Sequence, residues 1–86
     1  MEYTEKMKNR LKRIEGQARG ILRMMEEGKE CADVVHQMTA LRSAVDHMIA
    51  YVIGNHMEQC IRDNVIKGID NEKTIQEAIQ LLTKSR

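Results

Sequence analysis

A stripe of apolar side chains in the middle of the sequence limits the possible folds more than any other feature. Successive members are separated by four, three, four, three and four residues: Val34, Met38, Leu41, Val45, Met48 and Val52. This heptad-like spacing places them along one side of an α-helix, as in helices that pack lengthwise on other helices. Two further steps of four residues lead to His56 and Cys60, so an imidazole and a thiol continue the stripe.

The preceding segment has the pattern of an amphipathic helix. Its apolar residues recur at intervals of three and four: Met7, Leu11, Ile14, Ala18, Ile21 or Leu22, and Met25. Thr4 is the predicted N-cap, and Gly28 is predicted to end the helix. Gly16 and Gly20 lie inside it, each at a cost of roughly 1 kcal/mol relative to Ala, which indicates close packing or a bend.

The second predicted helix begins near Glu30, and Gly54-Asn55 is a candidate break within it. The stretch "IKGIDNEK" then predicts a turn, with Gly68 as the stop and Asp70 or Asn71 as the next cap. A third helix follows to about residue 84. Its apolar face consists of Ile75, Ile79 and Leu82.

Length and composition predict a single all-α domain spanning residues 1–86. The 86 residues include no Trp, Phe or Pro and only two Tyr, so the core cannot be built around large rings. A domain this short buries a thin core by itself. We therefore expect much of the apolar surface to be buried by self-association.

The sequence also predicts a cytoplasmic protein. It has no apolar run long enough to span a membrane and no stretch of signal-peptide type near Met1. Because cytoplasmic thiols are reduced, the two cysteines are expected to serve metal binding or redox chemistry rather than a structural disulfide.

Charge is distributed unevenly. Residues 6–23 contain seven basic side chains and one acidic side chain, although the net charge of the whole chain is +1. A basic element on an acidic body is typical of a polyanion-binding protein, with nucleic acid favoured over membrane. The alternative is an ordinary solvated helix face.

The positions of Cys31, His56 and Cys60 suggest a site shared between chains. His56 and Cys60, four residues apart, lie on one face of a helix. If the same helix begins near Cys31, then Cys31 is about 37 Å from His56 along it. An antiparallel partner helix would instead bring the second chain's Cys31 to this pair, with two such sites per dimer.

Two thiolates and an imidazole suit Cu(I), or zinc with a fourth ligand. The alternative is that the cysteines are ordinary core residues and that the His-x-x-x-Cys pair arises by chance. A Cys-His nucleophile pair is disfavoured, because the chain has no phosphate loop, no nucleophile elbow and no room for a substrate cleft. We therefore do not expect an enzyme.

Three stretches together resemble the CsoR family of bacterial repressors: "NRLKRIEGQARGI" (9–21), "CADVVHQMTALRSA" (31–44) and "HMEQC" (56–60). This family also includes the nickel/cobalt and formaldehyde sensors RcnR and FrmR and the persulfide sensor CstR. The resemblance covers nearly the whole chain. It implies a three-helix protomer, an antiparallel helical dimer and a dimer of dimers, which binds operator DNA without a helix-turn-helix and releases it when an effector binds.

The resemblance also implies residue roles. The Cys-His-Cys ligands of the copper sensors match Cys31, His56 and Cys60. The DNA-binding residues would be Arg10, Lys12, Arg13, Gln17, Arg19 and Arg42. Phosphate neutralisation by these bases would make binding steeply salt-dependent.

Two departures keep alternatives open. Copper sensors typically have a Tyr before the first Cys and a Glu in the third helix, which orient the ligands, but this chain has Glu30 and Gln76 there. In addition, "MMEEGKEC" and "EAIQLLTKS" resemble the persulfide-sensing branch, although that branch typically lacks the histidine found here as His56. The first hypothesis is therefore a repressor released by Cu(I), and the second is a repressor that senses reactive sulfur through Cys31 and Cys60. A helical scaffold or metal carrier without a DNA role is a third, weaker alternative.

Overall fold

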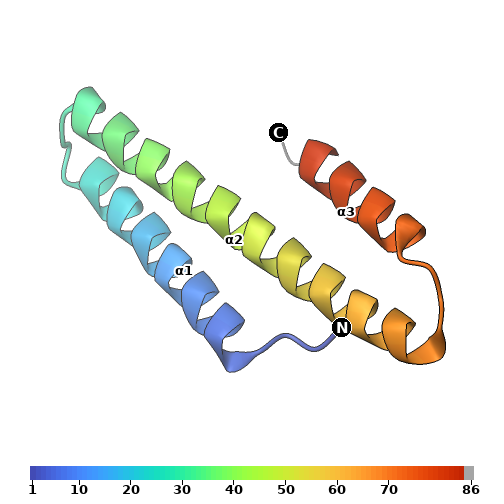
Figure 1. The fold of residues 1–86 in the computed structure, drawn as a ribbon. Coiled ribbons are helices and arrows are strands. Elements are labelled where there is room, and N and C mark those ends of the chain that lie inside the picture. The colour runs from blue at the N-terminus through green and yellow to red at the C-terminus, as the bar shows by residue number, and fades with distance from the viewer. Residues whose placement is uncertain (85–86) are drawn as a thin grey trace. The chain divides into compact units, whose positions relative to one another are not determined.

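The computed structural model describes residues 1–84, which form three helices and contain no strand. Helix α1 is Glu5–Glu26, α2 is Cys31–Lys67 and α3 is Glu72–Lys84 (Figure 1). The all-α class and the number of helices agree with the sequence prediction. Residues 85 and 86, which close the predicted domain 1–86 and include the last residue of "EAIQLLTKS", lie outside the described residues.

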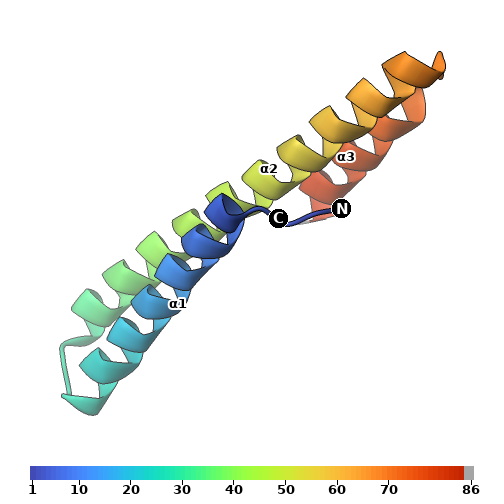
Figure 2. The ribbon, with the colours of Figure 1, turned by 90° about the horizontal axis from the view of Figure 1, so that it is seen from below.

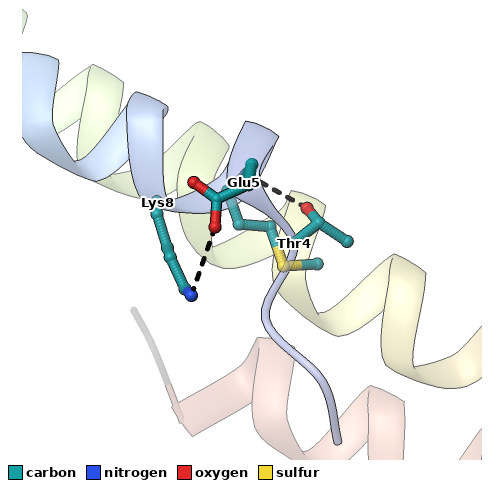
Figure 3. Close-up of polar contacts among 4 residues, drawn as sticks. Thr4, Glu5 and Lys8 are labelled. Carbon is teal, nitrogen blue, oxygen red and sulfur yellow. Dashed lines mark hydrogen bonds and ion pairs between the residues drawn. The ribbon is translucent and has the colours of Figure 1, made fainter.

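Helix α1 begins as its sequence predicts. Thr4 has an extended backbone, and its hydroxyl accepts a hydrogen bond from the Met7 backbone N–H at 3.2 Å. This bond satisfies one of the free N–H groups of the first turn. Glu5, favourably placed at the positive end of the helix dipole, forms an ion pair with Lys8 at 3.5 Å (Figure 3).

Glycines close both of the first two helices. At Gly28, φ is +68°, a value that few other residues adopt without strain. Its N–H donates to the Met25 carbonyl, and the Lys29 N–H donates to the Met24 carbonyl, which is the Schellman pattern. The same pattern follows α2 at Gly68, where φ is +70°. Both predicted stops are therefore confirmed.

The chain groups into two compact units, and the boundary falls inside α2. The first, residues 2–48, pairs α1 with the beginning of α2, and the two segments run side by side in both views (Figures 1 and 2). Its buried apolar side chains are Met7, Ile21 and Val34. Of the two candidates at the end of the α1 stripe, the structure thus buries Ile21 and leaves Leu22 56% exposed.

The second unit contains α3 and the part of α2 from residue 49 onward. Its buried apolar residue is Ala78. The side-chain amide of Asn64 donates to Asn71 Oδ1 at 3.0 Å and to Thr74 Oγ1 at 3.2 Å, which ties the end of α2 to the start of α3. The Asp70 carboxylate accepts from the Glu72 N–H at 3.4 Å, so Asp70 provides the side-chain cap. Whether both units fold as one domain stays a prediction.

The candidate break at Gly54-Asn55 is not a break, because α2 continues as a helix to Lys67. The Asn55 side-chain amide donates to the Tyr51 carbonyl at 2.9 Å, one turn earlier in the same helix. Gly16 and Gly20 do not serve close packing within the chain, since a Cβ at either position would meet nothing within 4 Å.

Many apolar side chains that define the three stripes remain exposed in the single chain. Leu11 is 56% exposed and Met38, in the heptad stripe, is 47% exposed. On α3, Ile75 and Ile79 are 43% and 57% exposed. In residues 1–84, no helix combines the length and apolar character needed to cross a membrane.

Candidate metal centre and nucleic-acid interface

His56 and Cys60 lie one turn apart on the same side of α2. Cys60 Sγ is 3.7 Å from His56 Nε2 and 3.9 Å from His56 Nδ1. Both separations are long, so neither ring nitrogen forms a short hydrogen bond with the sulfur. The imidazole is exposed and the thiol is half-buried, so an ion could reach both from solvent.

The separation of sulfur and nitrogen matches that of two ligands on one ion. In zinc sites, bonds to sulfur and imidazole nitrogen are about 2.3 Å and about 2.0–2.1 Å long. At angles of about 109–120° around the ion, such bonds place sulfur and nitrogen about 3.5–3.8 Å apart. The donor set of thiolate and imidazole is one that soft and borderline metal ions favour. The 3.7 Å separation of Cys60 Sγ and His56 Nε2 lies in this range, so these two atoms fit ligation of one ion.

The third predicted ligand, Cys31, is the first residue of α2, and its free thiol is exposed. Within residues 1–84, no three His, Cys, Asp or Glu side chains come together as a metal-binding group. The structure of one chain thus brings together His56 and Cys60 but not all three predicted ligands.

Glu30 and Gln76, which replace the expected ligand-orienting residues, are both exposed. In the described part of the chain, neither side chain forms a hydrogen bond with His56 or Cys60. Glu30 contributes only its carbonyl, which accepts from the Val34 N–H at 3.1 Å at the start of α2. An orienting role for these two residues stays a prediction.

The predicted DNA-binding residues of α1 fall on two sides of the helix. One side, named here the basic flank, carries no Asp or Glu and consists of Lys6, Arg10, Arg13 and Gln17. Arg19 is nine residues from Arg10, or about 2.5 turns at 3.6 residues per turn, so it projects on the opposite side. Lys12 lies on that opposite side as well. Arg42, the remaining predicted residue, is exposed on α2 within the same unit.

The side opposite the basic flank, named here the mixed flank, carries both acids and bases: Glu5, Lys8, Lys12, Glu15, Arg19, Arg23 and Glu26. Two of its pairs are ion pairs, Glu5 with Lys8 at 3.5 Å and Glu15 with Arg19 at 2.8 Å. The sequence prediction assigned Arg19 to DNA and overlooked Glu15 as its partner. The i, i+4 spacing of Glu before Arg was the signal that could have revealed the pair.

These features define a class of protein: a small helical protein with a thiolate-imidazole pair suited to a soft metal ion and a basic helix suited to a polyanion. The sequence model of the family described as "Metal-sensitive transcriptional repressor" matches residues 3–84. The chain therefore belongs to the metal-sensitive transcriptional repressor family, which confirms the resemblance found in its motifs.

Named relatives and solved structures agree with this assignment. The copper-sensing transcriptional repressor CsoR of Bacillus subtilis is 36% identical over 80 residues, which cover 93% of this chain and 78% of the relative. The nickel-responsive transcriptional regulator InrS has a similar structure, with a TM-score of 0.79, 34% identity and coverage of 96% of this chain and 92% of InrS. The copper-sensing repressor CsoR with Cu(I) from Geobacillus thermodenitrificans NG80-2 has a TM-score of 0.77 at 26% identity, with coverage of 98% and 91%.

Proposed function

We propose that this metal-sensing repressor binds operator DNA and releases it when Cu(I) is bound by Cys31, His56 and Cys60 across a subunit interface. The observation that carries the proposal is the His56–Cys60 pair, whose sulfur and nitrogen atoms are 3.7–3.9 Å apart on one face of α2. Two thiolates and one imidazole form a soft donor set that suits Cu(I). The similarity to proteins named as copper sensors supports this choice of metal.

The third ligand would come from a second copy of the chain. Helix α2 is continuous from Cys31 to Lys67. At ~1.5 Å per residue, the 25 residues from Cys31 to His56 extend much further than a metal–ligand bond. In an antiparallel pair of α2 helices, each Cys31 would approach the other chain's His56 and Cys60. Such a dimer would contain two equivalent sites.

Self-association is supported by the apolar surface of the single chain. The buried apolar residues in the described part of the chain are Met7, Ile21, Val34 and Ala78, a small core for helices of this length. At the end of α2, Val65 and Ile66 are 67% and 84% exposed. We propose that antiparallel dimers, associated as a dimer of dimers, cover this surface. The free thiols that the site needs fit the cytoplasmic location predicted from the sequence.

DNA binding would use the basic residues of the first unit: Arg10, Lys12, Arg13, Gln17, Arg19 and Arg42. Each contact that neutralises a phosphate releases counterions, so affinity would fall steeply as salt rises. Ligation would bias the orientation of α2 and, through the first unit, that of α1. Release then requires that the effector bind the DNA-free arrangement more tightly than the DNA-bound one.

The proposal is tested by anaerobic fluorescence anisotropy of the reduced protein on its own upstream DNA. One equivalent of Cu(I) per chain should dissociate the complex, and Ni(II) provides the comparison with the metal named for InrS. The His56→Ala variant should bind DNA but lose the copper response. His47→Ala is the matched control, because His47 is also an exposed α2 histidine, and its Nδ1 lies 2.8 Å from the Ser43 carbonyl oxygen rather than beside a thiol. A copper-loaded wild-type complex that stays intact would refute copper-driven release.

Reactive-sulfur sensing is the second candidate, and the two free thiols favour it. Cys31 is exposed and Cys60 is half-buried, so both can react. A sulfane-sulfur donor would transfer one sulfur atom to the thiolate of one cysteine, which forms a persulfide. The thiolate of the other chain would then attack the inner sulfur of that persulfide, which forms a disulfide between Cys31 of one chain and Cys60 of the other and expels the outer sulfur as hydrosulfide. His56→Ala separates the candidates, because a persulfide sensor should keep its response.

The scaffold alternative predicts that replacing Arg10 and Arg13 with Ala leaves any DNA association unchanged, whereas a repressor should lose operator binding.

A further inference from the structure

The basic and mixed flanks of α1 differ in one respect that affects any polyanion partner. On the mixed flank, carboxylates interleave with the bases, whereas the basic flank carries none. Glu15 is the sole acidic residue between positions 6 and 23, and its Oε1 accepts a hydrogen bond from Arg19 Nη2 at 2.8 Å. The only carboxylate of this basic stretch is thus bound to one of its arginines.

We propose that Glu15 competes with DNA phosphate for Arg19 and thereby limits the DNA affinity of α1. This inference rests on the DNA-binding part of the proposed function. A guanidinium presents its N–H donors to carboxylates and phosphates in the same geometry, so the two anions compete for the same group. A phosphate that approaches Arg19 must displace Glu15 or accept a carboxylate beside it.

The pair is exposed enough for this exchange to occur. The side chains of Arg19 and Glu15 are 70% and 66% exposed, so solvent and a partner can reach both. Exposed ion pairs of this kind are weak and easily exchanged. Glu15 therefore lowers affinity without blocking binding. The Glu5–Lys8 pair at the start of the same flank has the same character (Figure 3).

The test compares Glu15→Gln with a matched control on α2. Glu58 and Arg62 form the same i, i+4 pair at 2.7 Å, with side chains 60% and 75% exposed, but lie outside the basic stretch. Glu58→Gln therefore removes the same charge and the same kind of pair. Both variants and the wild type are titrated onto operator DNA and onto an unrelated duplex, over a range of KCl concentrations, with helix content checked by circular dichroism.

Glu15→Gln should bind DNA about two- to tenfold more tightly than the wild type at low salt, because an exposed pair is broken and a repulsion is removed. Its salt dependence should steepen by up to about 0.9 in the slope of log affinity against log salt for each phosphate gained. Glu58→Gln should change affinity much less. Adding Arg19→Ala should abolish the gain, because Glu15 acts through Arg19.

Equal gains in the two Gln variants would overturn the inference, since net charge alone would explain them. A loss of affinity in Glu15→Gln would also overturn it, because Glu15 would then position Arg19 for DNA. A gain that persists without Arg19 would refute the competition. Failure of the proposed function looks different: the wild type would then bind both duplexes equally, and the comparison on the unrelated duplex would still measure the electrostatic effect of Glu15. A wild type that binds neither duplex would refute the inference together with the proposed function, because Arg19 would then have no phosphate partner.

Discussion

The intersubunit origin of the proposed metal site can be tested by complementation between two defective chains. One chain carries Cys31→Ser and keeps His56 and Cys60. The other carries His56→Ala and Cys60→Ser and keeps Cys31. Neither homodimer has a complete set of three ligands. A mixed dimer has one complete site, formed by Cys31 of the second chain and the His56–Cys60 pair of the first.

The expected magnitude follows from the geometry of α2. Cys31 and His56 are 25 residues apart on α2, or about 37 Å along a helix, so one chain is not expected to complete the proposed site by itself. Random association of equal amounts makes about half of the dimers mixed, each with one site where a wild-type dimer has two. The mixture should therefore hold about a quarter of the wild-type Cu(I) per chain.

The assay is anaerobic Cu(I) titration against a competing chelator, strong enough to remove copper from sites that lack a ligand. The chains are co-expressed with different tags, so that the mixed dimer can be purified and its stoichiometry measured directly. Full copper binding by either defective chain alone would refute the argument, and so would no binding by the purified mixed dimer. The first result would show that the residues removed from that chain are not needed as ligands, and the second would exclude Cys31 of the other chain as the residue that completes the site.

Three further predictions concern stability and should be measured by chemical denaturation at one fixed chain concentration, because association contributes to apparent stability. Gly54→Ala should stabilise the protein by about 0.5–1 kcal/mol, since Gly54 is helical and a Cβ there meets nothing within 4 Å. Gly68→Ala should instead destabilise it by about 1–2 kcal/mol, because φ is +70° at that position; effects of the same sign would contradict this reasoning. Asn64→Ala should cost about 1–3 kcal/mol, because it removes two side-chain hydrogen bonds from α2, one to Asn71 just before α3 and one to Thr74 in its first turn. Asn9→Ala, at an exposed position on α1, is its control and should change stability little.

The helix boundaries were predictable because their signals are local. Thr4 caps α1 through its own hydroxyl, and Gly28 and Gly68 end helices through backbone angles that glycine adopts easily. The predicted break at Gly54 was wrong, because a glycine inside a helix does not end the helix by itself. A helical glycine has a modest cost, and the surrounding apolar stripe favours a helix that continues through it.

The spacing of His56 and Cys60 predicted their shared helix face correctly, because a four-residue interval on a helix has only one geometry. The completion of the site by Cys31 cannot be derived in the same way, since it depends on a second chain. Helical spacing also separates the basic residues of α1 into two flanks, yet the resemblance alone grouped them together. The partner of Arg19 was also available from spacing, because Glu15 stands four residues before it on the same side of α1.

The position of Cys31 suggests how a metal bound on α2 could act on a DNA-binding helix. Cys31 begins α2 only a few residues after α1 ends at Glu26. The intervening turn is held by backbone hydrogen bonds from Gly28 and Lys29 to the last turn of α1. On the proposed site, a constraint on Cys31 would be transmitted through this short, hydrogen-bonded turn to the helix that carries the basic flank. At the proposed site, Cys31 would bind a metal ion that is also held by His56 and Cys60 of a second chain, which would restrict the orientation of α1 directly. Metal sensing and DNA binding would then be coupled without a longer route through the core.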